Sequence, residues 1–147
     1  MAETEQPETD APRADGAALA RSWLESSPFV AHLRIGIELM EPDRAVLSMP
    51  FTDSLPTLGD VVHGGAISSL IDTAAAAAAW SGAEVPERPR ASTVGITVDF
   101  LAPARGQSVT ADARVVRRGG NGLCFCEVRA HAEDGTDVAL ALVTYQL

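Results

Sequence analysis

The chain has 147 residues, 46% of them hydrophobic, and a net charge of −9 at pH 7. This length and composition predict one domain that folds around its own core without metals or disulfides. The acidic balance argues against a nucleic-acid partner, because such proteins bind by neutralising phosphates. No apolar run is long enough to span a membrane, and the acidic start does not resemble a signal peptide, so we expect a cytoplasmic protein.

The N-terminal segment differs in composition from the rest of the chain. Residues 1–16 are rich in Glu, Thr, Pro, Asp and Ala and contain almost no large apolar side chain. Such a segment cannot bury enough surface to offset the entropy of ordering. We therefore predict a disordered acidic tail over residues 1–16 and a single domain over residues 17–147.

The domain is expected to begin with a short helix and two strands. An apolar stripe predicts the helix over about 17–25, and the prolines and serines that follow should end it. Apolar residues at period two predict strands over 34–40 and 45–51, joined by a turn at 41–43. Residues 53–60 contain Pro and Gly and are expected to form a loop before the next helix.

A long alanine-rich helix is predicted over residues 64–80. Its six consecutive alanines favour helix and have small side chains, so other backbone can approach closely. After a loop over 81–90, four further strands are predicted at 93–100, 109–117, 123–132 and 138–145. Strands joined by short turns indicate an antiparallel sheet, and five to six of them wrapped around one central helix make an α+β fold.

Two cysteines, Cys124 and Cys126, lie two residues apart on a predicted strand. Their side chains should therefore point to the same face, which makes them a poor disulfide pair. A CxC sequence without further Cys or a His cluster is also a weak metal site. We interpret both as core thiols and expect neither a metal nor a cofactor.

The start of the long helix carries the sequence His63-Gly64-Gly65. The first N–H groups of a helix have no intrahelical partner and lie at the positive end of its dipole. Glycine also lets a ligand approach the backbone closely. This end could therefore hold a developing oxyanion. The alternative, a tight turn into a helix with no ligand, stays open on spacing alone.

Asp72 is the one carboxylate inside this otherwise apolar helix. Helical spacing places it on the same face as Ser68, Ala76 and Ala79, a face of small residues that should pack rather than face solvent. A buried carboxylate needs partners and is a candidate functional group. An aspartate that only bonds a neighbouring backbone remains an equal alternative.

Gly64 and Asp72 are eight residues apart, or roughly 12 Å along a regular helix. One ester or thioester carbon cannot contact both within a single chain. If both act on one substrate, the second must come from another subunit. The spacing therefore predicts a homodimer with sites at its interface.

The run His63-Gly64-Gly65, followed after six residues by Asp72-Thr73, resembles the signature of the PaaI-like hotdog thioesterases. The resemblance extends over about residues 18–147. It implies the hotdog fold, in which an antiparallel sheet wraps one helix, and assembly into a homodimer or, as a dimer of dimers, a homotetramer.

The resemblance also implies an acyl-CoA hydrolase without a cofactor. In that family the N–H of Gly64 would polarise the thioester carbonyl, and Asp72 of the facing subunit would be general base or nucleophile. His63 would help to position the thioester, and Thr93 would assist the attacking water. Thr57 stands where the family commonly has an asparagine, which favours altered activity or substrate.

A second group of residues is expected to bind the CoA part of the substrate. Arginines beside a glycine turn can meet phosphates with guanidinium and backbone together, and the similar turn of the family often contacts CoA. Exposed charge at a strand end is an equal alternative. The candidates are Gly65, Arg105, Arg117, Arg118, Gly119, Gly120 and Asn121.

Two other functions remain. A non-catalytic acyl-CoA binding or sensing protein is favoured by Thr57 in the asparagine position. A hotdog hydratase is disfavoured, because its different Asp/His pattern is absent from the sequence. The identity of the acyl group is left open by the sequence.

Overall fold

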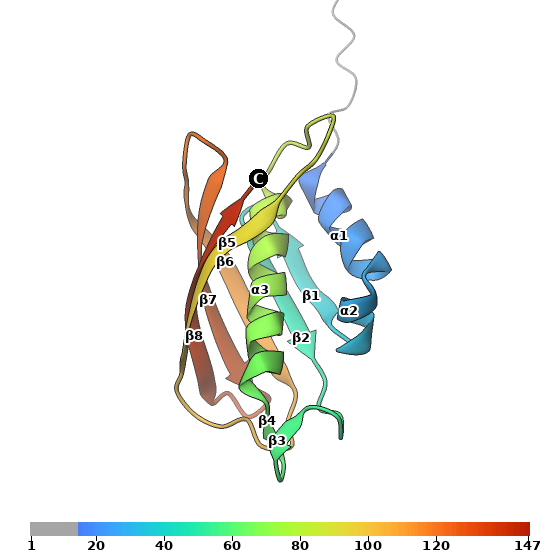
Figure 1. Cartoon of the computed structure of the whole chain (residues 1–147), viewed down its shortest axis with the longest axis vertical. Coiled ribbons are helices and arrows are strands. Elements are labelled where there is room, and N and C mark those ends of the chain that lie inside the picture. Colours follow the sequence, from blue (N-terminus) through green and yellow to red (C-terminus); the bar gives the residue numbers. More distant parts are fainter. Residues whose placement is uncertain (1–14) are drawn as a thin grey trace, which may run out of the picture.

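The computed structural model describes residues 15–147, in which a curved antiparallel sheet of six strands surrounds one long helix (Figure 1). Of the predicted tail, residues 1–14 lie outside the described residues, while Asp15 caps the first helix and Gly16 begins it. The elements in chain order are α1 (Gly16–Ser26), α2 (Pro28–His32), β1 (Gly36–Glu41), β2 (Arg44–Met49), β3 (Pro56–Leu58), β4 (Val61–Val62), α3 (Gly64–Ser81), β5 (Ser92–Phe100), β6 (Val109–Arg118), β7 (Leu123–Ala132) and β8 (Asp137–Gln146).

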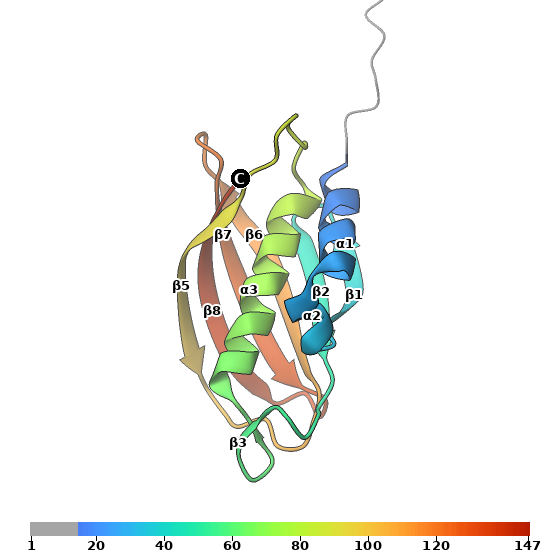
Figure 2. The ribbon, with the colours of Figure 1, turned by 45° about the vertical axis from the view of Figure 1, so that its right-hand side comes forward.

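The strand order is β1-β2-β6-β7-β8-β5, and all neighbours pair antiparallel. The predicted α+β architecture is therefore confirmed. In Figures 1 and 2, α3 lies along the concave side of the sheet, with α1 and α2 beside it toward β1. No helix in the described part of the chain is long and apolar enough to cross a membrane.

Three local predictions need correction. The segment after α1 was expected only to end that helix, but Ser27 caps a second helix, α2, with Pro28 at its first position. The predicted loop at 53–60 contains β3, which pairs with β4. The first strand begins at Gly36 rather than residue 34, because Arg34 adopts a left-handed backbone with φ of 54°.

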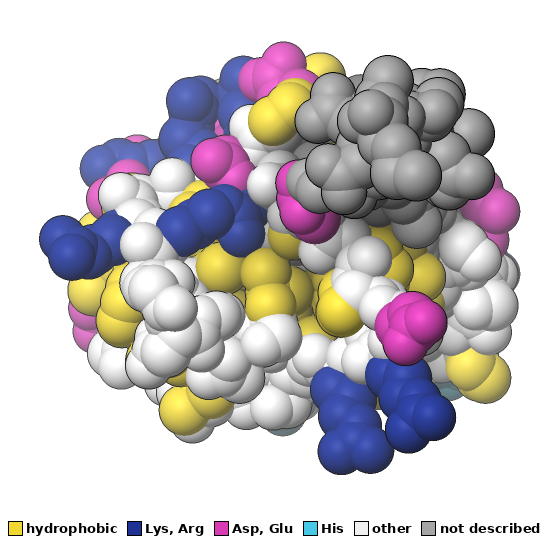
Figure 3. Space-filling view, turned by 90° about the horizontal axis from the view of Figure 1, so that it is seen from above, with side chains coloured by type: hydrophobic (Ala, Val, Ile, Leu, Met, Phe, Trp, Pro, Cys, Tyr) yellow, Lys and Arg dark blue, Asp and Glu magenta, His cyan; other side chains and the backbone are white. Residues whose placement is uncertain are grey.

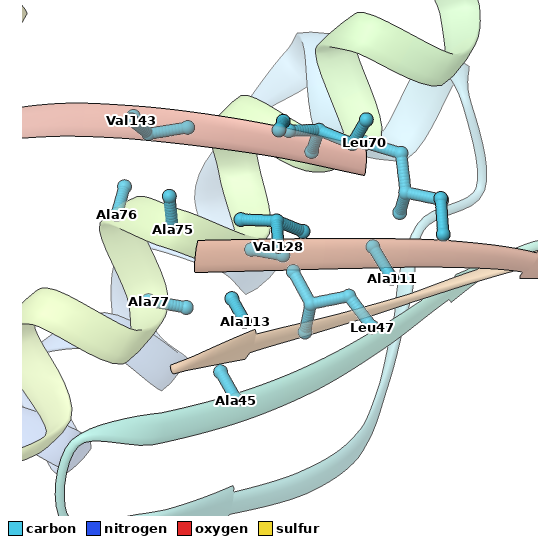
Figure 4. Packing of buried hydrophobic residues seen from close by; sticks show 14 of the residues in the cluster. Ala45, Leu47, Leu70, Ala75, Ala76, Ala77, Ala111, Ala113, Val128 and Val143 are labelled. Atoms are coloured by element: carbon cyan, nitrogen blue, oxygen red, sulfur yellow. The ribbon is translucent and has the colours of Figure 1, made fainter. Parts of the chain in front are cut away.

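Small side chains let α3 lie close to the sheet. Each alanine from 74 to 79 is at most 8% exposed. Figure 4 shows Ala75, Ala76 and Ala77 of α3 among residues of the sheet that include Ala113 and Val128. Alanine faces alanine across much of this contact, so the close approach predicted from the sequence is confirmed.

Both cysteines are free and buried on the inner face of β7, as predicted. Burial raises the pKa of Cys124, and it raises the pKa of Cys126 from its ordinary value of 9.0 to about 12. Thiols in this state are protonated at neutral pH and behave as small apolar side chains.

Strand β5 differs from the other strands that cover α3. It is the last strand of the sheet and pairs only with β8, so its other edge is unpaired within the described chain. Apolar side chains at this edge are exposed, including Val94 at 62%, Ile96 at 43% and Phe100 at 54%. An open edge with apolar side chains is a ready template for a further strand.

Candidate functional site

The side chain of His63 caps α3. Its Nδ1 accepts a hydrogen bond of 2.7 Å from the Gly65 N–H. In the neutral ring the proton therefore sits on Nε2. Because Gly65 is engaged in this way, its N–H is not free for a ligand.

The N–H of Gly64 remains open. No acceptor within residues 15–147 hydrogen-bonds to it. Gly64 and Thr57 line one cavity of about 330 Å³ together with Phe100. A side chain at Gly64 would meet Phe100, because a Cβ there would lie 3.1 Å from the ring. His63 and Gly65 line a different cavity, beside α2.

Asp72 is half-buried and contacts the strand that follows its helix. The Thr93 hydroxyl donates a hydrogen bond of 2.6 Å to Asp72 Oδ1. This partner is a side chain, and in the described residues Asp72 accepts no backbone N–H. Asp72 and Thr93 together line a cavity of about 430 Å³ and, with Ser68 and Ser69, a smaller one of about 250 Å³.

Gly64 and Asp72 thus lie in separate cavities along one helix. The cavity that holds Gly64 and the two cavities that hold Asp72 share no lining residue. The Gly64 cavity offers an open backbone N–H at a helix N-terminus, which can stabilise an oxyanion. The Asp72 cavities offer a carboxylate oriented by a hydroxyl, which can accept a proton or attack a carbonyl carbon.

The candidate CoA-binding arginines have different surroundings. Arg118 donates to Asp43, to the Ala79 carbonyl at 2.8 Å and to Cys124 Sγ at 3.2 Å. It therefore ties the C-terminal end of α3 to the β1–β2 turn. Arg105 forms an exposed ion pair of 3.1 Å with Asp60.

Arg117 is exposed, and its side chain makes no hydrogen bond or ion pair with the rest of the described chain. The turn that follows it is closed by a bond of 2.6 Å from the Gly119 N–H to the Leu123 carbonyl. Gly120 has open space around it, and Asn121 accepts from the Leu123 N–H. This turn and the one that carries Arg105 lie at opposite ends of the sheet (Figure 1).

Three aromatic residues that the sequence did not single out as candidate site residues, Trp23, Trp80 and Tyr145, line the larger cavity beside Asp72. Tyr145 and Asp72 line the same cavity, and burial raises the pKa of the Tyr145 phenol, with a smaller rise from the charge of Asp72. The only sequence signal for this wall was the apolar stripe of α1. That stripe predicts a buried face of the helix but does not say what the face covers.

Residues 59–139 match the family model described as the thioesterase superfamily. The chain belongs to the thioesterase superfamily. The predicted family resemblance, the hotdog fold and the enzyme class, a thioester hydrolase, are therefore confirmed. Gly64, Asp72 and Thr93 all fall within the residues that match the superfamily model.

Three known proteins illustrate the similarity. The medium/long-chain acyl-CoA thioesterase YigI of Salmonella typhimurium is 29% identical over 138 residues, with 81% of this chain and 88% of YigI covered. A solved thioesterase family protein of Silicibacter pomeroyi has a TM-score of 0.81 and 30% identity, covering 89% of this chain and 96% of that one. The E. coli PaaI protein has a TM-score of 0.77 and 28% identity, covering 89% and 92%.

Proposed function

We propose that this protein hydrolyses acyl-CoA thioesters at sites that two subunits of a homodimer share. The observation that carries the proposal is the separation of Gly64 and Asp72 into cavities with no common lining residue. Each half lacks what the other supplies. The activity of the YigI relatives supports an acyl-CoA as the thioester.

The edge of β5 supplies a way to join the halves. Near one end of this strand Thr93 bonds to Asp72, and at the other end Phe100 covers Gly64. When β5 pairs antiparallel with the β5 of a second copy, the Thr93 end of one strand lies opposite the Phe100 end of the other. A two-fold axis then forms two equal sites, and the exposed Ile96 becomes buried.

Each shared site has the parts for thioester hydrolysis. The Gly64 N–H and the positive end of α3 stabilise the oxyanion that forms on the carbonyl oxygen. Asp72, held by the Thr93 hydroxyl, takes a proton from water as the water oxygen bonds to the carbonyl carbon. The carbon–sulfur bond then breaks, and the departing CoA thiolate takes up a proton. The second route, direct attack by Asp72, passes through a mixed anhydride that water cleaves.

His63 and Thr57 have secondary roles in this scheme. Because His63 caps the Gly65 N–H, it fixes the backbone that presents the Gly64 N–H. Thr57 lines the same cavity as Gly64, which supports a role for its hydroxyl in orienting the carbonyl or the water, at the position where an asparagine is usual.

CoA binding falls to the residues at the ends of the sheet. In the antiparallel dimer, the β6–β7 turn of one subunit lies at the same end as Arg105 and Gly64 of the other. Arg117 is free to meet a phosphate, and the open backbone at Gly120 and Asn121 can donate to it. Arg105 can exchange its exposed partner Asp60 for a phosphate. Arg118 is engaged inside the fold and is assigned a structural role.

The direct test is thiol release from a panel of acyl-CoA substrates by the wild type and by Asp72→Asn. We expect kcat to fall by about 10²-fold or more, the usual size of a lost general base. Asp53→Asn, a change of the same kind in an exposed loop, is the matched control. Equal rates for wild type and Asp72→Asn would show that the carboxylate is wrongly assigned.

A binding-only function is the second candidate, and Thr57 is the observation that favours it. It predicts that the wild type binds acyl-CoA but releases no thiol from any member of the panel. Measuring binding by calorimetry alongside thiol release separates the two candidates with one set of substrates.

A further inference from the structure

The larger cavity beside Asp72 is apolar along most of its length. Its apolar walls come from separate regions of the chain: Leu19 and Trp23 from α1, Ala76 and Trp80 from α3, Pro89 from the segment that leads into β5, and Tyr145 from β8. Figure 3, which looks down on this end of the molecule, shows hydrophobic surface in a hollow between surrounding side chains. The functional polar groups, Asp72 and Thr93, lie together on the wall.

The cavity extends away from the carboxylate along α3. Asp72, Ala76 and Trp80 follow one another at intervals of four residues, so they lie on one face of the helix over roughly 12 Å. Asp72, Ala76 and Trp80 all line this cavity. A substrate with its carbonyl carbon at Asp72 therefore has the apolar side chains Ala76 and Trp80 within reach of its acyl group.

The far wall is fixed. Trp80 is only 4% exposed. Where α1 crosses the end of α3, a Cβ at Gly16 would lie 2.1 Å from the Trp80 carbonyl oxygen, so the two helices are in direct backbone contact. A helix held this closely cannot retreat to admit a longer group.

We propose that this cavity receives the acyl group of the substrate and restricts the enzyme to medium-length acyl chains, with Trp23 and Ala76 as the residues that set the limit. The proposal rests on the proposed function. The cavity has a volume of about 430 Å³ and mostly apolar walls. An acyl chain of medium length covers far more of this apolar surface than an acetyl group does, and burying apolar surface favours binding.

The first test measures binding without catalysis. The chain has two tryptophans, and both line the cavity. Titrating the whole protein with decanoate should change the tryptophan emission in a saturable way, whereas acetate at the same concentration should not. A decanoate titration that leaves the emission unchanged would overturn the proposal, whatever the activity of the protein.

The second test compares kcat/KM for acyl-CoA esters from acetyl to palmitoyl. Ala76→Phe should fill the cavity and lower kcat/KM for decanoyl-CoA about tenfold or more relative to acetyl-CoA, since one misplaced methylene already costs about tenfold. Trp23→Ala should remove the wall and shift the optimum toward palmitoyl-CoA. Phe29→Ala, an exposed aromatic on α2, is the matched control and should leave the profile unchanged.

The outcomes separate the two proposals. A chain-length profile that is the same in wild type, Ala76→Phe and Trp23→Ala would overturn the assignment of the cavity while acyl-CoA hydrolysis stands. A wild type that prefers an aromatic ester such as phenylacetyl-CoA would overturn the medium-chain assignment. Saturable decanoate binding without hydrolysis of any ester would support the cavity and contradict the catalytic function.

Discussion

The two halves of α3 belong to one continuous helix, yet their surroundings are opposite. In residues 64–73 the polar side chains Ser68, Ser69, Asp72 and Thr73 are half-buried and border cavities. In residues 74–81 every residue is buried against the sheet and α1. In the proposed mechanism the first half meets the substrate and a second subunit, while the second half fixes the helix in place. The first half is buried only through its apolar residues Ile67, Leu70 and Ile71, whereas the second half is buried on all sides.

Among substitutions that distinguish the two halves of α3, the largest change in activity is expected at Gly64. Gly64→Pro removes the open N–H at a helix position where proline is well tolerated, and His63, with φ −61° and ψ 134°, suits a following proline. We expect kcat to fall by about 10²- to 10³-fold, as for one lost oxyanion donor. Thiol release gives the rate, and circular dichroism checks the helix.

Gly64→Ala is the control for that change. It adds a Cβ against Phe100 in the same way but keeps the N–H. If the alanine and proline variants lose the same activity, crowding of Phe100 explains the loss and the N–H is not catalytic.

The second half of α3 should respond in stability instead. Ala77 is fully buried and faces the sheet (Figure 4), so Ala77→Leu overpacks the contact and should destabilise the fold by about 1–3 kcal/mol. Ser68→Ala in the first half should change the free energy of unfolding by less than about 0.5 kcal/mol. Urea unfolding of both variants measures the difference. Similar losses at the two positions would remove the distinction between the halves.

The smallest effect concerns the thiols beneath the second half. Cys126 Sγ lies 3.8 Å from the Ala75 carbonyl oxygen, and burial raises its pKa to about 12. Because the pKa is higher in the folded state, this term favours folding below about pH 9 and is lost as the pH rises from 9 toward 12. Alkylation by iodoacetamide at pH 8 should be slow until urea unfolds the chain. Rapid modification of the native protein would mean that this half opens to solvent.

The sequence predicted the parts of this arrangement that depend on local pattern. The six alanines and the glycines at its start predicted α3, whose end differs from the prediction by one residue. Alternation of apolar and polar residues predicted all six strands of the large sheet. Helix α2 was missed although Ser27 and Pro28 form a helix start, because the same residues also end α1.

The site was predictable only in part. Helical spacing separated Gly64 from Asp72 without any structure, and the family resemblance pointed to Thr93. The cavity wall at Trp23 could not be predicted, since it depends on how α1 packs across α3. Arg118 was a candidate for phosphate binding because it stands beside a glycine turn. Its partner in the structure is Asp43, which lies 75 residues away in the sequence, and no local pattern reveals such a pairing.

The central claim, that each site takes Gly64 from one subunit and Asp72 from the other, has a direct test in mixed dimers. Gly64→Pro and Asp72→Asn subunits with different tags are refolded together, and the dimers that carry both tags are purified. Each such dimer has one site with both original groups and one site with neither. We predict that it regains about half of the wild-type rate of thiol release, while each parent stays inactive. A mixed dimer no more active than its parents would contradict the shared site.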